Sequence, residues 1–529
     1  MKEKTTLLVE KVQHCLRSAS KGKPVKAFFG DEPQTKIGGG CLLWEVERSN
    51  GLIAGAARCL REWRLPSCIN FSMFQLLWQR VLLICCGYED AVDGQLLSSD
   101  PGLQLGLGFK PAMQSTMSRF ENRIGMISCY KLASWLVYHY IATKRREPES
   151  IRLDFDGSCF RVRGQQQGSS YRKHYDTQML FPLFVFDQDG VLITAMLRPG
   201  SHGELSMTLP ILKRLVKVFR SAWPNVKITV VMDAGFNSPR IYDWCEDQGK
   251  EDPVKTVYYL IKLKNTGGGL LSHSDDLARA AKISFTKCYG EQRYKEKASV
   301  KKTELEKQIM QKEKSERRKE LKELSQRIGR SYGEFRYQTG MGGKDPKQWR
   351  SQRRILVECK YDDWGARRTF WITNLIGGRT YEMINDIYAR RGEQELRIKD
   401  AKAFRCDKMS LQEFLPNQFR LLMHVLSQRL LRQFREVLPE RFQRVSLKSI
   451  SETFLRMPAI IQEKARTVEI RWPASFGFKN AVHTACRRLL PRISMSTASH
   501  PNFDQFWKPL FALSRNDTEP LVLPLSRAG

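Results

Sequence analysis

Five short apolar runs between residues 151 and 264 constrain the fold most. Each is rich in β-branched or aromatic residues and is bounded by Gly, Pro or Asp: "IRLDFDGS", "LFPLFVFD", "VLITAMLRPG", "VKITVVMDAGF" and "VYYLIKLK". A helical pattern over residues 204–223 separates the third run from the fourth, and a second helix precedes the fifth. This order of strands and helices predicts a mixed α/β sheet.

Three meandering strands followed by a crossover are typical of an RNase H-like domain, although the pattern also allows a generic doubly wound sheet. Residues 51–147 come before the sheet and are mostly helical, with "MFQLLWQRVLLICCGYEDA" and "CYKLASWLVYHYIATKRR" as the clearest amphipathic segments. No helix-turn-helix signature is present there, so a DNA-binding domain and a structural bundle both remain open.

The pattern divides the chain into five parts. The basic block 293–330 predicts an exposed helix or helical pair, with a solvated arm and a DNA contact as open alternatives. The predicted parts are a mostly helical N-terminal putative DNA-binding domain (1–147), the first part of the catalytic domain (148–265), an insertion with a basic helical arm and a β part (266–369), the second catalytic part (370–440), and a C-terminal region for dimer or DNA contacts with a tail (441–529).

The charge of the chain indicates a polyanionic partner. Lys and Arg number 88 against 56 Asp and Glu, a formal net charge of +32, and the basic residues run through the whole sequence. Such a distribution favours nucleic acid over a membrane. No uninterrupted apolar run of membrane-spanning length and no secretion signal are apparent, and the 13 cysteines form no CxxC pair. We therefore expect a DNA-bound protein of a bacterial cytoplasm, associated with the nucleoid.

Acidic residues lie in two of the predicted strands. Asp154 and Asp156 are two residues apart, so both side chains project from one face of a strand. Asp233 directly follows an apolar run, at the carboxyl end of its strand, where open α/β sheets place their active crevices. Each Asp alone has the simpler interpretation of a turn cap. Together they predict a site that needs a third acid.

The stretch "YARRGEQELRIKDAK", residues 388–402, offers that third acid. In a 3.6-residue helix, Glu395 shares one stripe with four other residues, Tyr388, Arg391, Lys399 and Lys402. Leu396 and Phe404 are expected to hold this helix against the sheet. Gly392 weakens the helix, which suggests that something approaches its backbone closely.

Three carboxylates from two strands and a helix can hold a pair of divalent cations. Oxygen ligands suit Mg²⁺, with Mn²⁺ as a substitute, and two ions about 3.5 to 4 Å apart clamp the attacking and leaving oxygens of a phosphodiester. Arg391, Lys399 and Lys402 are expected to bind the phosphate oxygens of the strand.

These residues resemble a known family. The spacing from Tyr388 through Arg391 and Glu395 to Lys402 is the third-motif signature of cut-and-paste insertion-sequence transposases of the DDE class. "LDFDGS", "LRPG", "MDAGF", "WITNL" and "LPNQFRLL" are similar to one bacterial branch, and the resemblance covers about residues 35–485. It implies an RNase H-like catalytic domain with a β-rich insertion. By motif position the catalytic acids are Asp156, Asp233 and Glu395, with Asp154 as the rival for the first place.

The resemblance also implies a mechanism and partners. The enzyme would bind the terminal inverted repeats as a homodimer on DNA, hydrolyse the element ends with two metal ions, and join the freed 3′-hydroxyl to target DNA. Some relatives form a DNA hairpin with a flipped base, for which Trp364 and Trp371 are candidate stacking residues and core packing is the alternative. A structure-specific nuclease on the same fold and an inactive DNA-binding repressor are the rival functions.

Overall fold

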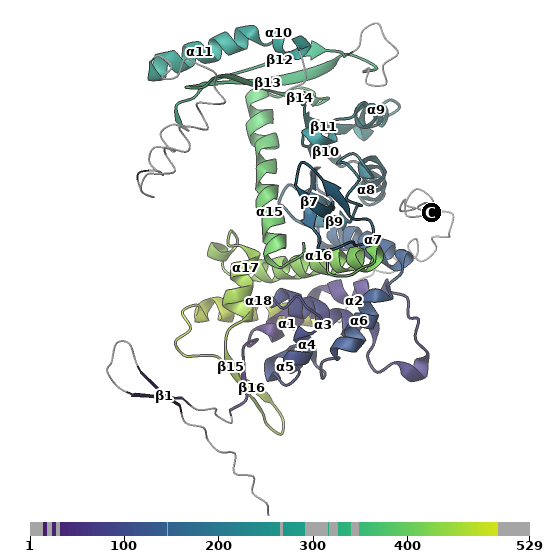
Figure 1. Ribbon diagram of the computed structural model, residues 1–529, viewed down its shortest axis with the longest axis vertical. Coiled ribbons are helices and arrows are strands. Elements are labelled where there is room, and N and C mark those ends of the chain that lie inside the picture. Colours follow the sequence, from purple (N-terminus) through teal and green to yellow (C-terminus); the bar gives the residue numbers. More distant parts are fainter. Residues whose placement is uncertain are drawn as a thin grey trace, which may run out of the picture.

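The computed structural model describes residues 14–17, 24–27, 32–144, 146–264, 268–290, 316, 326–339 and 349–495 (Figure 1). Most of the basic block predicted at 293–330, and the predicted tail after residue 495, lie outside the described residues. The domain boundaries given above remain predictions.

An eight-stranded mixed sheet forms the centre of the molecule, with the order β12-β13-β14-β11-β10-β4-β8-β9. The five apolar runs all form strands of this sheet, so the predicted mixed α/β fold is confirmed. β8 is antiparallel to both β4 and β9, whereas β10 is parallel to both β4 and β11. The five strands are β4 (Ser150–Gly157), β8 (Leu183–Asp187), β9 (Leu192–Met196), β10 (Lys227–Met232) and β11 (Val257–Lys262).

Alternation along the strands fixes the two faces of the sheet. Ile151, Leu153 and Phe155 of β4 project into one core, which α8 (Thr208–Ala222) covers with residues including Leu215 and Phe219. α9 (Pro239–Asp247) connects β10 to β11 and contributes to the same core. The opposite face of the sheet therefore carries the even-numbered residues of β4, including both of its aspartates.

Three further strands extend the sheet beyond β11. They are β12 (Gly329–Tyr337), β13 (Arg353–Asp362) and β14 (Gly365–Thr373), and β14 pairs antiparallel with β11. α11 (Asp275–Tyr289) packs on these strands, and a Cβ at Gly329 would lie only 2.1 Å from the backbone oxygen of Ala281. The close approach of helix and strand therefore requires glycine at this position. A small second sheet, β5 (Phe160–Arg161), β6 (Ser170–Arg172) and β7 (Thr177–Leu180), follows β4.

Seven helices precede the sheet within the described residues. One described segment, Pro66–Cys85, has the length and composition of a membrane span, but eleven of the thirteen residues of its helix α3 are buried, as in a core helix. A capping box between Ser72 and Gln75 begins α3. The helices are α1 (Gly40–Asn50), α2 (Leu52–Arg58), α3 (Met73–Cys85), α4 (Asp93–Leu96), α5 (Pro101–Leu107), α6 (Gln114–Asn122) and α7 (Met126–Thr143).

Helix α16 (Phe414–Val437) joins the two halves of the molecule, because it lies between these helices and the sheet (Figure 1). Twenty of its 24 residues are buried, including polar residues, so it is packed on nearly all sides. One hydrophobic core includes residues from α1, α3, α16 and the C-terminal helix α18 (Lys479–Met495). β3 (Gln34–Thr35) also pairs with β15 (Ala459–Glu463), which in turn pairs with β16 (Val468–Arg471).

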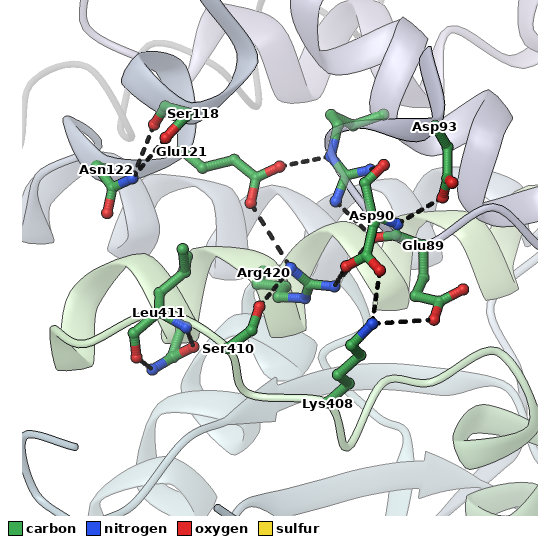
Figure 2. Close-up of polar contacts among 12 residues, drawn as sticks. Glu89, Asp90, Asp93, Ser118, Glu121, Asn122, Lys408, Ser410, Leu411 and Arg420 are labelled. Carbon is green, nitrogen blue, oxygen red and sulfur yellow. Dashed lines mark hydrogen bonds and ion pairs between the residues drawn. The ribbon is translucent and has the colours of Figure 1, made fainter. Parts of the chain in front are cut away.

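A buried ionic cluster also links α16 to the N-terminal helices (Figure 2). The Arg80 Nε atom lies 2.5 Å from Glu121 Oε1, and both side chains are almost fully buried. Arg420 of α16 lies 3.7 Å from Asp90, and Lys408 lies 2.6 Å from the same carboxylate. Arg420 also lies 4.0 Å from the buried Glu121, so removal of Glu121 would leave buried positive charge on both parts without its partner.

Candidate active site

Asp156 and Asp233 lie beside one another at the ends of neighbouring parallel strands. Met232, the last residue of β10, is in register with Phe155 of β4, so the next residues along the two chains are Asp233 and Asp156. The Asp233 carboxylate accepts a hydrogen bond of 2.6 Å from the backbone N–H of Gly235, which holds the turn that follows β10. Parallel pairing therefore brings together two acids that are 77 residues apart in the sequence.

Arg391 lies between these two carboxylates. Its Nη1 atom is 3.8 Å from Asp156 Oδ1, and its Nη2 atom is 3.8 Å from Asp233 Oδ2. The Arg391 side chain is only 11% exposed, whereas that of Asp233 is 44% exposed, so the cluster opens to solvent on the Asp233 side. One guanidinium thus compensates two carboxylates at the carboxyl ends of β4 and β10.

The electrostatics of this cluster favour positive charge between the acids. Burial lowers the pKa of Arg391, but Tyr388, Asp156 and Asp233 raise it by a larger amount, so the guanidinium stays charged. The ring of Tyr388 packs against the guanidinium, with 5.4 Å between Cζ of Arg391 and the ring centroid. Burial raises the pKa of the Tyr388 hydroxyl, which remains neutral.

Asp154 occupies a different environment on the same face of β4. Its side chain is fully buried, and its Oδ2 atom accepts a 2.9 Å hydrogen bond from Nη2 of Arg152. Arg152 also donates to the backbone oxygen of Ile387 over 3.1 Å, which connects the strand to the segment before Arg391. The buried Asp154 is therefore engaged in an internal ion pair, whereas Asp156 retains some exposure.

The segment that carries Glu395 is not one continuous α-helix. A π-helical stretch, Met383–Tyr388, is followed by a 3₁₀ turn, Ala389–Arg391, and α15 begins at Gly392 and ends at Ala403. The backbone of Glu395 lies in α15, but its side chain falls outside the described residues. No described protein atom lies within 4 Å of a Cβ placed at Gly392, so the chain itself does not occupy that space.

The expected packing of this helix is only half correct. Phe404 is buried at 5% exposure, as predicted, but Leu396 is 62% exposed. Ile398 and Ala401 are buried instead, so the packed side of α15 follows i, i+3 spacing with Phe404. Leu396 and Ile398 are about 200° apart around the helix, so a helix that packs on Ile398 exposes Leu396.

The two lysines of the predicted stripe have different positions. Lys402 Nζ donates a 3.1 Å hydrogen bond to the backbone oxygen of Cys159, three residues after Asp156. It also lies 5.6 Å from the ring centroid of Phe160. Lys399 is exposed on α15. Lys402 is thus held at the end of β4, while Lys399 faces solvent.

The two candidate tryptophans are far apart along the β13–β14 hairpin. Trp371 is 3% exposed, and its ring centroid lies 5.4 Å from that of Tyr388, so it packs beneath the cluster. Trp364 lies in the turn before β14, where its N–H donates to Asp362. Seven residues of strand separate the two by roughly 24 Å.

Arg198, to which the motif analysis assigned no role, lies close to Gly157, next to Asp156. It is 1% exposed and donates to the backbone oxygens of Phe181, Glu204 and Ser206 at 2.9, 2.7 and 3.0 Å. Burial lowers its pKa to about 10. A Cβ at Gly157 would lie 3.2 Å from its Nη2 and 2.9 Å from Phe181, so glycine after Asp156 leaves room for this packing. The sequence signal that could have identified Arg198 is a charged residue in "LRPG" directly after a buried strand.

The chemistry of the donors suits an oxygen-binding cation. Two carboxylates converge on the positive group of Arg391, and oxygen donors of this type match Mg²⁺ or Mn²⁺. Within the described residues, no group of three or more His, Cys, Asp or Glu side chains has the arrangement of a metal site. The Glu395 side chain does not belong to that set, so the third ligand remains a prediction.

Comparison with known proteins identifies the family. A family model described as "Transposase DDE domain group 1" matches residues 17–493. Among solved structures, the cryo-EM structure of the piggyBac transposase synaptic complex with hairpin DNA is similar at 9% identity and a TM-score of 0.34, covering 91% of this chain and 86% of that chain. No curated protein matches. Because the family model spans nearly the whole chain, the chain belongs to this family of DDE transposases.

Proposed function

We propose that this transposase serves an insertion sequence: it binds the terminal inverted repeats, cleaves at the element ends and joins them to target DNA. The observation that carries the proposal is the bridge from Arg391 of the third motif to Asp156 and Asp233 at 3.8 Å each. The strand order β9-β8-β4-β10-β11, with β8 antiparallel, supports an RNase H-like assignment for the catalytic domain.

In this proposal Asp156, Asp233 and Glu395 bind two divalent ions. When bound, the ions would supply activation of the attacking oxygen and stabilisation of the leaving oxygen at the phosphodiester. The exposure of Asp156 next to Arg391 favours it over Asp154, whose carboxylate is buried against Arg152. We assign Asp154 a structural role on this basis.

The cations of the segment position DNA. Two carboxylates would repel a DNA backbone, and Arg391 places a planar donor group between them. Its guanidinium can hold two non-bridging phosphate oxygens in bidentate fashion. Lys402 lies at the end of β4 and Lys399 faces solvent, so both are placed to bind phosphates further along the DNA strand. The ring of Tyr388 packs against the guanidinium of Arg391.

The test is cleavage and joining of labelled DNA that carries the terminal repeat. Asp156→Asn, Asp233→Asn and Glu395→Gln should each reduce cleavage by more than about 100-fold, because even the outer partners of metal ligands contribute 10- to 100-fold. Asp276→Asn, at a 90% exposed carboxylate of α11, is the matched control and should leave the rate unchanged. Normal cleavage in the three variants would exclude this site.

The same assay separates the rival functions. A transposase gives joined product with target DNA in the presence of Mg²⁺ or Mn²⁺, whereas a nuclease gives cleavage alone and a repressor gives neither. The mass of the complex on a two-ended substrate tests the proposed homodimer. Two copies on paired ends are expected, and a single copy that completes both steps would contradict that part of the proposal.

A further inference from the structure

A cleft lies between α15, α16 and the turn that joins β8 to β9. The space inside it that can hold the centre of a water-sized molecule is about 30 Å³, and the cleft is open to solvent on one side. Four arginines and one aspartate are its charged lining residues: Arg397, Asp400, Arg429, Arg432 and Arg435. Arg397 is two positions after Glu395, which places the two residues about 200° apart around α15. The helical period therefore predicts that the cleft and the candidate catalytic glutamate lie on opposite sides of α15.

Two of these arginines are buried without a carboxylate partner. Arg429 is 4% exposed and donates to the backbone oxygen of Leu192 at 3.2 Å and toward the ring of His139 at 3.2 Å. Arg435 is 9% exposed and donates to the backbone oxygen of Val445 at 3.0 Å, while its buried Nε has no hydrogen-bond partner. Within the described part of the chain, no carboxylate oxygen lies within 4.0 Å of either guanidinium. Buried charge of this kind normally requires a counter-ion.

Burial lowers the pKa of Arg429 and the buried Asp187 raises it, whereas the two acids nearest Arg435 compensate its charge only weakly. Asp400 accepts a hydrogen bond from the backbone N–H of Leu447, and burial raises the pKa of its carboxyl. Glu436 lies 3.6 Å from Arg432 but is 55% exposed to solvent, where the pair is screened. Burial first, and then the charges of Arg432 and Arg397, lower the pKa of Arg435 to about 10. The arginines thus repel one another in a partly dry space.

The local backbone also fits a built site. Gly190, in the turn after β8, has a φ of +71°, and a Cβ there would lie 1.6 Å from Nε and 2.0 Å from Cζ of Arg397. Only glycine both adopts this conformation without strain and leaves space for the guanidinium. The wall of the cleft is therefore shaped around an arginine.

We propose that this cleft binds a phosphate group through Arg397, Arg432 and Arg435. A phosphate presents several charged oxygens to planar guanidinium donors, and its charge would compensate Arg435, which has no carboxylate oxygen within 4.0 Å among the described residues. Two sources carry this chemistry: a phosphodiester of the bound DNA and free inorganic phosphate. The site is separate from the proposed catalytic acids, so it is testable without cleavage.

The first experiment uses inorganic phosphate and thermal unfolding of the full chain in a metal-free buffer, against chloride at equal ionic strength. Phosphate at ten times its dissociation constant should raise the Tm by about 1–3 °C. Arg432→Gln and Arg435→Lys should abolish the shift. The second variant retains the charge and limits the risk of misfolding. Arg444→Gln removes an exposed arginine nearby and should retain the shift.

The second experiment measures duplex DNA binding as a function of salt, again without metal. If a DNA phosphodiester occupies the cleft, Arg432→Gln should reduce the slope of log affinity against log salt by about 0.9, the value for one phosphate contact. Arg444→Gln should reduce it by less. A phosphate-specific Tm shift with an unchanged DNA slope assigns the site to free phosphate.

The two experiments together decide the proposal. It is overturned if phosphate gives wild-type protein no specific Tm shift and Arg432→Gln has the same DNA slope as wild type, or if Arg444→Gln reproduces every effect of the cleft variants. Asp233→Asn should keep both readouts at wild-type values. A failure of the catalytic assignment is therefore distinguishable from a failure of this one.

Discussion

Arginines lie both at the 3₁₀ turn before α15 and in the cleft between α15 and α16, but the charges around those arginines differ. At the turn, Arg391 lies 3.8 Å from each of two carboxylates. In the cleft, Arg429 and Arg435 are buried, and their hydrogen-bond acceptors are backbone oxygens and a histidine ring. The carboxylates around Arg391 can also bind a metal cation, whereas the buried arginines of the cleft can bind an anion. The surrounding groups, and not the residue type, determine which ligand each place favours.

The largest effect is expected from removal of the arginine between the acids. Arg391→Ala should reduce DNA cleavage by about 100- to 1,000-fold, because it removes a preorganised donor from the reacting phosphate. Arg397→Ala, on the other side of α15, should change the cleavage rate by less than about tenfold. The rate of single-turnover cleavage on labelled repeat DNA is the measurement. Equal losses in the two variants would remove the distinction between the two sides.

A second prediction concerns metal binding without catalysis. At one hundred times its dissociation constant, Mg²⁺ should stabilise the wild-type fold by about 2.7 kcal/mol. The double variant Asp156→Asn, Asp233→Asn should lose this stabilisation, and Arg432→Gln should keep it. Urea unfolding with and without Mg²⁺ measures the difference. Undiminished stabilisation in the double variant would place the metal elsewhere in the chain.

A third prediction uses the neutral histidine next to the cleft. Burial, followed by the charge of Arg429, lowers the pKa of His139 to about 3. The unfolded chain therefore binds more protons than the folded one between about pH 6.5 and 3, and stability falls as the pH decreases through this window. His139→Gln should remove about 3 kcal/mol of that loss between pH 6.5 and 4, as measured by urea unfolding.

The control for this prediction is His483→Gln, at an exposed position of α18. It should leave the slope of stability against pH unchanged. If wild type and His139→Gln have parallel curves, His139 is protonated in the folded state and the electrostatic description of the cleft is wrong.

The smallest expected effect is a difference between two glycine substitutions. It separates the cost of backbone strain from the cost of displacing Arg397. Gly164 and Gly190 have φ values of +72° and +71°, but only Gly190 faces a side chain, that of Arg397. Gly164→Ala should cost about 1 kcal/mol of stability for its left-handed backbone. Gly190→Ala should cost about 2 kcal/mol, because Arg397 must also move, and it should weaken phosphate protection. Equal costs would mean that Arg397 is not held by the turn.

The sheet was largely predictable from the sequence because its strands are continuous β-branched runs. Such runs indicate a buried strand locally, and all five belong to the central sheet. The sequence did not determine which strands are neighbours. That Asp156 and Asp233 lie side by side depends on the parallel pairing of β4 with β10, which the intervening crossover makes possible.

Two features were less predictable from the sequence: which side of α15 packs on the core, and which arginines are buried. A uniform helical period assigned Leu396 to the packed side, but α15 packs on Ile398 and Ala401, so Leu396 is exposed. Arg198 and Arg435 were missed because arginines are ordinarily surface residues, and their burial depends on backbone oxygens supplied by distant segments. The roles of Asp156, Asp233 and Glu395 themselves remain proposals.

Helix α15 is twelve residues long, a rod of about 18 Å that carries Glu395 and the wall of the cleft on opposite flanks. A rod of this length cannot tilt at one flank without displacing the other. The independence of the two sites that the variants test therefore requires that phosphate in the cleft leaves the angle of this helix unchanged. By thermodynamic reciprocity, a coupling that is absent in one direction is absent in the other.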